Sequence, residues 1–234
     1  MQYPIVEVDG PYRRLIPSKY PTIDLYERFG SPAMQALAAE LEKLTNPRLQ
    51  ARMRIAGGEL PAETGSPMLQ NWNHAPFAYP LPEGSQFLPP PYPVMELAAT
   101  EIGALARAVL RREEFLSRTD EPLCGVDMRV ISNRIKGSFI DLRGLPADMT
   151  PQAKWLIGQE LYADEISGIV FKMHDVAECD FIGIFRLDVL QDNGVQGAHY
   201  RFRWDGTRIN RIFDFAANAD VDRSAILSAQ RVAA

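Results

Sequence analysis

Two segments decide the fold, Arg14-Leu-Ile-Pro-Ser-Lys-Tyr20 and Gly168-Ile-Val-Phe-Lys-Met173. Six further short motifs keep a fixed order around them, and no single one would identify a fold. The six are Thr45-Asn-Pro-Arg-Leu49, Gly84-Ser-Gln-Phe87, Val126-Asp-Met-Arg-Val130, Asp141-Leu-Arg-Gly144, Ile182-Gly-Ile-Phe-Arg186 and His199-Tyr-Arg-Phe-Arg-Trp-Asp-Gly206. Their combined order and spacing over nearly the whole chain make the pattern specific.

The composition predicts one cytoplasmic domain. The 234 residues are 46% hydrophobic and 24% charged, which suffices for one substantial core. A net charge of -5 argues against nucleic-acid binding, because neutralising phosphates needs Lys and Arg clustered on one face. Two cysteines without paired spacing, Cys124 and Cys179, fit a reducing compartment. No apolar run approaches the ~20 residues that a bilayer requires, so no membrane contact is expected.

Capping and apolar spacing predict three helices. Ser31 followed by Pro32 is typical of a helix start, and apolar residues at helical spacing continue to Leu44. Residues 96–116 contain no proline and predict a long helix. Thr150-Pro151 predicts a third helix start. Its expected core-facing residues are Trp155, Leu156 and Leu161.

Residues 57–93 are too rich in proline and glycine for regular structure through most of their length. Trp72, Phe77 and Phe87 nevertheless make this stretch too apolar for a free linker. We therefore expect an ordered loop that packs across the domain and covers its cleft.

Most of the predicted strands lie in the second half. Short segments rich in β-branched or aromatic residues are Val126–Ser132, Gly168–Met173 and Phe181–Val189. The alternating run 200–204, the turn Asp205-Gly206 and the returning run 208–213 predict a β-hairpin. From Asp214 onward the composition indicates a surface tail or a partner-docking helix.

Over about Tyr12 to Phe213, the motifs resemble those of the longer members of the RES-domain family. That family is similar to ADP-ribosyltransferases and is best known as the toxin half of toxin–antitoxin pairs that degrade NAD or transfer ADP-ribose from it. The resemblance implies a single α+β domain over residues 1–234, with a core of about 12–213 and a mixed central β-sheet flanked by helices.

The family's site implies roles for matched positions of this chain. Its members present a basic residue on the first strand, an Arg in a Ser-Arg-Phe motif, a Tyr, a catalytic Glu on the next helix and a Ser at a strand end. Cationic and phenolic groups hold the NAD pyrophosphate and ribose, and the carboxylate stabilises the cationic transition state as nicotinamide leaves. Arg14 and Lys19 keep the family's positive charge and are the candidate NAD-binding residues.

Four matched positions have changed. Gln86 replaces a bidentate phosphate clamp with a neutral amide, and Glu96 places an anion where the family has a phenol. The catalytic Glu falls on Arg107, and losing such an electrostatic contribution is worth ~3 kcal/mol or more. Met173 replaces the serine and makes no strong hydrogen bond. The alternatives are that the register is shifted, or that a neighbouring residue such as Glu114 has taken over the carboxylate's role.

The resemblance therefore implies a catalytically silenced RES-fold protein that acts by binding or complex formation. Its partner would be antitoxin-like or a complex subunit, and a homo-oligomer is compatible with the sequence. The alternative is an active NAD-consuming or ADP-ribosylating toxin with a rearranged site. A third hypothesis is a metal-dependent activity, against which a plain polar turn weighs more heavily. Its potential ligands are His174, Asp175, Glu178, Cys179 and Asp180.

Overall fold

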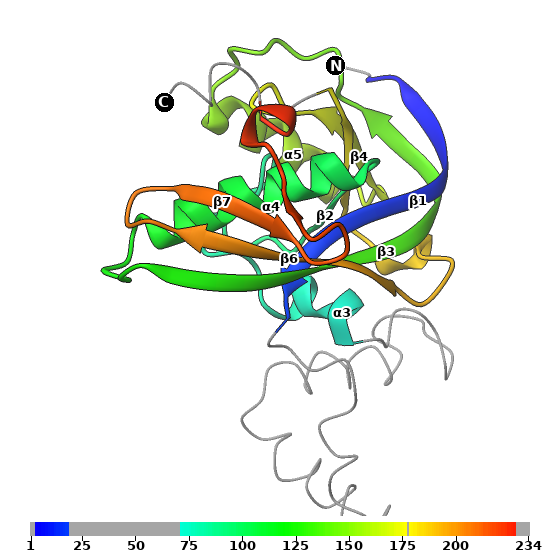
Figure 1. Cartoon of the computed structure of the whole chain (residues 1–234). Helices are drawn as coiled ribbons and strands as arrows, with labels where there is room; N and C mark the ends of the chain where they lie inside the picture. The colour runs from blue at the N-terminus through cyan, green and yellow to red at the C-terminus, as the bar shows by residue number, and fades with distance from the viewer. Residues whose placement is uncertain (1–2, 19–70, 177, 228–234) are drawn as a thin grey trace, which may run out of the picture.

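The computed structural model describes residues 3–18, 71–176 and 178–227 (Figure 1). The helices are α3 (Asn71–Ala78), α4 (Glu101–Leu116) and α5 (Pro151–Ala163), with short 3-10 turns η3 (Leu187–Val189) and η4 (Arg223–Ala225). The strands are β1 (Ile5–Pro17), β2 (Met95–Ala98), β3 (Cys124–Asp141), β4 (Gly168–Lys172), β5 (Asp180–Ile184), β6 (Val195–Trp204), β7 (Ile209–Asp214) and β8 (Ala219–Asp220).

The strands form one mixed sheet in the order β1-β2-β5-β4-β3-β6-β7-β8. The β3–β4 pair is parallel and the other pairs are antiparallel. An additional long β1–β3 ladder, from Ile5 opposite Ile140 to Pro17 opposite Met128, joins the first strand to the middle of the sheet. β1, β2, β5, β4 and β3 therefore form a closed ring, and β6 to β8 extend from it. The predicted single α+β domain with a mixed sheet flanked by helices is confirmed.

Alternation along the ring's strands separates two hydrophobic clusters. One cluster draws on all five strands of the ring and fills its interior, with Val8, Leu97, Phe139, Val170 and Ile182 among its members. The other lies between the outer face of the sheet and helices α4 and α5. On β2, Met95 and Leu97 belong to the inner cluster and Ala98 to the outer one, so Glu96 also points outward, toward α4.

The expectation of one helix over residues 96–116 is wrong at its start. Residues 95–98 form β2, because Met95 and Leu97 alternate into the ring and the segment pairs with β5. The helix begins only after Thr100, whose hydroxyl accepts a hydrogen bond from the Gly103 amide at 3.0 Å.

Helix α5 begins as predicted, with Thr150 as its cap and Pro151 in its first turn. Leu161 is buried as expected. Trp155 is only half-buried and belongs to neither cluster; its indole N–H donates to the Ser85 carbonyl oxygen at 3.0 Å. The expectation for Leu156 is wrong, because this side chain is 69% exposed. The predicted helix from Ser31 lies outside the described residues.

The predicted strands lie at the expected positions in the sequence, but several have different lengths: β3 and β6 are longer and β5 is shorter than predicted. β4 and the turn of the β6–β7 hairpin match, and Gly206 occupies this turn with a φ of 97°. β3 is 18 residues long because it belongs both to the ring and to the hairpin sheet. β5 ends at Ile184, and the rest of the predicted strand 181–189 turns into η3.

Two segments differ from expectation: the breaker-rich stretch 57–93 contains a helix, and the chain after Asp214 contains a short strand. Within the breaker-rich stretch, α3 forms with Pro76 inside it, and Phe77 and Phe87 pack against the two clusters. Residues 57–70 of that stretch lie outside the described residues. After Asp214 the chain forms the short strand β8 and the 3-10 turn η4 and buries Ile226 and Leu227, so as far as Leu227 it packs on the domain and forms neither an exposed tail nor an α-helix.

Among the described residues, no helix has the length and apolar character to span a membrane.

Candidate functional site

A cavity of about 750 Å³ lies between the end of β1, helix α3 with the residues after it, β2 and helix α4. Three of the matched positions line it: Arg14 from β1, Glu96 from β2 and Arg107 from α4. Gln86 and Met173 are not among its lining residues. The structure therefore brings together three of the five described positions that the resemblance places in one site. Lys19 lies outside the described residues.

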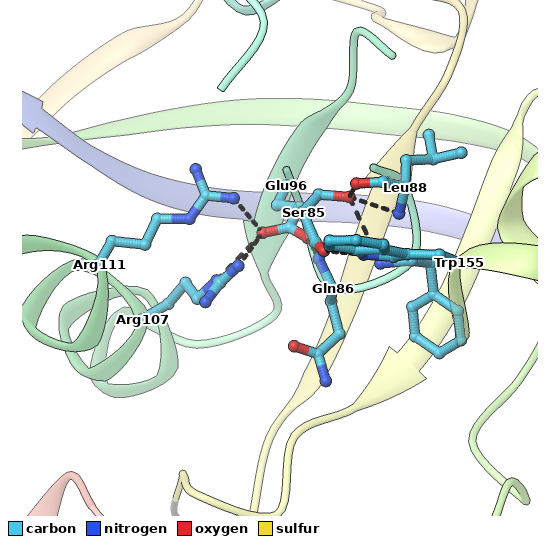
Figure 2. A network of polar contacts seen from close by, with 8 residues as sticks. Ser85, Gln86, Leu88, Glu96, Arg107, Arg111 and Trp155 are labelled. Atoms are coloured by element: carbon cyan, nitrogen blue, oxygen red, sulfur yellow. Dashed lines mark hydrogen bonds and ion pairs between the residues drawn. The ribbon is translucent and has the colours of Figure 1, made fainter. Parts of the chain in front are cut away.

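Glu96 is the centre of a compact ion-pair cluster with Arg107 and Arg111 (Figure 2). One carboxylate oxygen, Oε2, accepts from Arg107 Nε at 3.0 Å and Nη2 at 2.7 Å, and from Arg111 Nη2 at 2.7 Å. The other, Oε1, accepts the backbone N–H of Gln86 at 2.8 Å. The Glu96 side chain is only 4% exposed.

Electrostatics keep this carboxylate ionised. Burial acts to raise the pKa of Glu96, but the nearby charges of Arg107 and Arg111 and the Gln86 amide outweigh burial and hold the pKa at about 2. Burial and the like charge of Arg107 lower the pKa of Arg111 to about 10, which still leaves it protonated at neutral pH. The cluster therefore carries two positive charges and one negative charge.

Arg14 has no carboxylate partner among the described residues. Its Nη2 donates to the backbone carbonyl of Trp72, while its buried Nε finds no hydrogen-bond partner. Burial and the charge of Arg111 lower its pKa to about 10. A buried guanidinium without a carboxylate has unused capacity to bind an anion.

Gln86 contributes its backbone rather than its side chain. The turn at Ser85-Gln86-Phe87 is held by the Ser85 hydroxyl, which accepts the Leu88 amide at 2.9 Å. Figure 2 shows the Gln86 side chain pointing away from the Glu96 carboxylate. The turn thus presents an amide to Glu96, and the neutral side chain at position 86 takes no part in the cluster.

Met173 directly follows β4 and is a buried member of the outer hydrophobic cluster. Its carbonyl accepts the Val176 amide at 3.4 Å. Within the described structure this methionine therefore packs in the core.

The lining of the cavity is strongly cationic. It contains six arginines and three glutamates, which leaves three positive charges in excess, although the whole chain carries -5. The six are Arg13, Arg14, Arg107, Arg111, Arg112 and Arg129. Only Arg14 and Arg107 were predicted at this site from the sequence, because the other four lie on β1, β3 and α4 at positions to which the resemblance assigns no role.

Two retained motifs have structural roles. In Asp141-Leu-Arg-Gly144, Arg143 donates to Asp141 at 2.6 and 2.9 Å and to Asp180 at 2.7 Å, which ties the end of β3 to the start of β5. These hydrogen bonds lower the pKa of Asp141. In Trp204-Asp-Gly206, the Asp205 carboxylate accepts the Thr207 and Arg208 amides at 2.9 Å and fixes the hairpin turn.

The proposed metal ligands at 174–180 are engaged separately. Asp180 pairs with Arg143 and Glu178 with Lys172, while Cys179 is buried beside Thr100. Over the part of the chain that the structure describes, no three His, Cys, Asp or Glu residues form a group able to hold a metal ion.

Comparison with known proteins gives one clear relative. The chain is 37% identical over 210 residues to the uncharacterized protein y4oC of Sinorhizobium fredii, and the match covers 90% of each sequence. It is also similar to a chain in the crystal structure of the M. tuberculosis MbcT–MbcA toxin–antitoxin complex, at 9% identity over 86% of this chain and 87% of that chain, with a TM-score of 0.41. No family model matches the chain.

Proposed function

We propose that this chain, which belongs to the same family as the Sinorhizobium fredii protein y4oC, is a RES-like binding protein that has lost NAD-cleaving chemistry. In this proposal its arginine-lined cavity takes an anionic ligand, and the protein acts through complexes with a protein partner. The observation that carries the proposal is the ion-pair cluster of Glu96 with Arg107 and Arg111.

The cluster is unsuited to cleaving a glycosidic bond. A carboxylate that stabilises a developing sugar cation must keep an oxygen free for the substrate. Glu96 is the central carboxylate of the cavity, and its Oε2 already accepts three hydrogen bonds. Arg107, at the position that the resemblance gives to the catalytic Glu, would oppose positive charge on the sugar. Both features raise the barrier to nicotinamide release.

The cavity is nevertheless suited to holding an anion. Its excess of three positive charges includes Arg14, which pairs with no carboxylate in the described part of the chain and whose Nε makes no hydrogen bond. The repulsion expected from Glu96 is cancelled, because two guanidinium groups neutralise that carboxylate. These charges favour a phosphate-bearing ligand that the protein binds but does not cleave.

The test separates binding from turnover. Purified protein would be incubated with NAD while NAD loss is followed by chromatography, and the protein would be expressed in bacteria while growth and cellular NAD are measured. We expect neither NAD loss nor growth arrest. NAD depletion that disappears in Arg14→Ala but persists in Arg208→Ala, an exposed hairpin arginine outside the cavity, would establish the active-enzyme alternative instead.

A further inference from the structure

A second hollow of about 670 Å³ is lined by residues from the start of β3 and from the β6–β7 hairpin. Figure 1 shows these strands side by side. We call this hollow the hairpin groove. It is lined by Leu123, Cys124, Gly125, Arg201, Arg203, Trp204, Asp205, Asn210, Arg211, Phe213 and Phe215. None of these residues lines the arginine-rich cavity.

The lining of the groove contains three arginines, Arg201, Arg203 and Arg211, and one acidic residue, Asp205. Its exposed arginines lie on the face of β6 and β7 that points away from the buried Phe202 and Ile212. Arg203 and Arg211 stand directly opposite each other on the two strands, where like charges are unfavourable. Asp220 pairs with Arg211 at 2.7 Å and Asp127 with Arg201 at 2.6 Å. Within the described structure Arg203 has no acidic partner.

The groove also exposes apolar surface. Leu123 is 75% exposed and Phe215 is 46% exposed. The rings of Phe213 and Phe215 meet edge to face at 5.4 Å. Arg201 covers the Phe215 ring at 5.4 Å and Arg211 covers the Phe213 ring at 5.8 Å. Charged heads and apolar rings thus alternate across one small surface.

We propose that the hairpin groove docks an acidic segment of a partner protein that carries at least one large apolar side chain. Carboxylates of the segment would bind Arg203 and Arg211, and its apolar side chain would cover Leu123 beside the Phe213–Phe215 pair. A close carboxylate would relieve the repulsion between the two opposed arginines. This inference is independent of the cavity, since it holds whether or not the protein acts on NAD.

The same observations disfavour a nucleic acid in the groove. Single strands bind by stacking bases on free aromatic faces, and here guanidinium groups already lie over both rings. Arg201 and Arg211 are held in that position by Asp127 and Asp220. An extended polyanion would also meet the remaining charge of a chain that carries -5. A short acidic peptide requires only the local positive charge.

The experiment uses the full chain and a short synthetic peptide that alternates glutamate with leucine and phenylalanine. Binding would be followed by nuclear magnetic resonance of the tryptophan indoles, because the chain has three tryptophans in three places. Trp204 lines the groove, Trp72 lines the cavity, and Trp155 packs on the Ser85 turn. We expect the peptide to shift the Trp204 signal and leave the Trp72 signal in place.

Two matched arginine variants test whether the positive charge of the groove binds the peptide. Arg203→Glu should weaken peptide binding about tenfold or more, whereas Arg208→Glu, the same change on the same hairpin outside the groove, should alter it less than about twofold. Leu123→Ser should weaken binding without changing its salt dependence. Equal losses in both arginine variants, or tighter binding of a lysine-leucine peptide or an oligonucleotide, would overturn the proposal. So would a dimer in light scattering that Arg203→Glu dissociates, since the occupant would then be a second copy.

Discussion

Glu96 makes folding sensitive to acid. Its pKa is 4.5 in an unperturbed carboxyl group and about 2 in the folded protein. A pKa that folding depresses adds stability above the unfolded value, and that stability is lost as pH falls through the folded value. The difference corresponds to roughly 3 kcal/mol. We expect this contribution to the free energy of unfolding to be complete above about pH 5 and to disappear toward pH 2.

The measurement is urea denaturation of wild type and Glu96→Gln across that range. At neutral pH the variant should lose ~3 kcal/mol or more, because Arg107 and Arg111 keep their buried charges without a counter-ion. The difference between the two proteins should shrink as pH falls from 5 to about 2. A constant difference over this range would show that ionisation of Glu96 does not stabilise the fold.

The pairing of Glu96 with Arg107 could not be predicted from the sequence because of one helix boundary. In a continuous helix over 96–116, the two residues would lie about 16 Å apart along the axis. They meet only because Glu96 belongs to β2 and the chain turns back at Thr100 into α4. Arg14, by contrast, was correctly placed on the first strand, because that prediction depends only on the local sequence and not on a contact with a distant residue.

At the scale of elements, Gly158 sets how closely α5 approaches the Ser85 turn. A Cβ at position 158 would lie 1.7 Å from the Phe87 carbonyl oxygen. Alanine favours a helix over glycine by about 1 kcal/mol. Gly158→Ala should nevertheless destabilise the protein by ~1–3 kcal/mol, because α5 or the turn must move. Thermal unfolding would measure the change.

Gly144→Ala is the control for this prediction, since nothing lies within 4 Å of its added methyl group. Its effect should be within about 0.5 kcal/mol. Because the Ser85 turn also carries the Gln86 amide to Glu96, Gly158→Ala should in addition reduce the acid-dependent stability described above. An unchanged melting temperature for Gly158→Ala would show that the helix and the turn separate easily.

Glu113 and Arg223 fasten the C-terminal segment to α4 and β7. Glu113 accepts the Ile209 amide at 2.7 Å and pairs with Arg223 at 2.8 Å, and Arg223 donates to the Ile209 carbonyl at 2.8 Å. Arg223→Ala should speed amide exchange in residues 219–227 while leaving β4 and β5 protected. Hydrogen exchange read by mass spectrometry checks this expectation. Arg118→Ala, which removes an exposed ion pair of α4, should leave the segment unchanged.

At the scale of the whole molecule, the ring of strands explains why the motifs are spread over nearly the entire chain. The α+β class was implied by the family resemblance, and the strands and caps that are local in sequence predicted several of its elements. Closure of the ring was not, because β1 pairs with β3 and β2 with β5, segments separated by long stretches of chain. The arginine-rich cavity lies where β1, β2 and α4 come together, so its six arginines could not be grouped from sequence spacing.

The excess of positive charge in the arginine-rich cavity should make the cavity bind phosphate-bearing anions. Pyrophosphate or ADP-ribose should raise the melting temperature, because a ligand that binds only the folded state stabilises it by mass action. Arg14→Ala should weaken binding about tenfold or more, since a charge-assisted contact is worth ~1.5–3 kcal/mol. Arg13→Ala is the control, because Arg13 lines the same cavity and donates to the Ala99 carbonyl at 2.9 Å but, unlike Arg14, has no buried nitrogen that lacks a hydrogen-bond partner. Equal loss in both variants would indicate diffuse attraction by the arginines rather than a site built on Arg14.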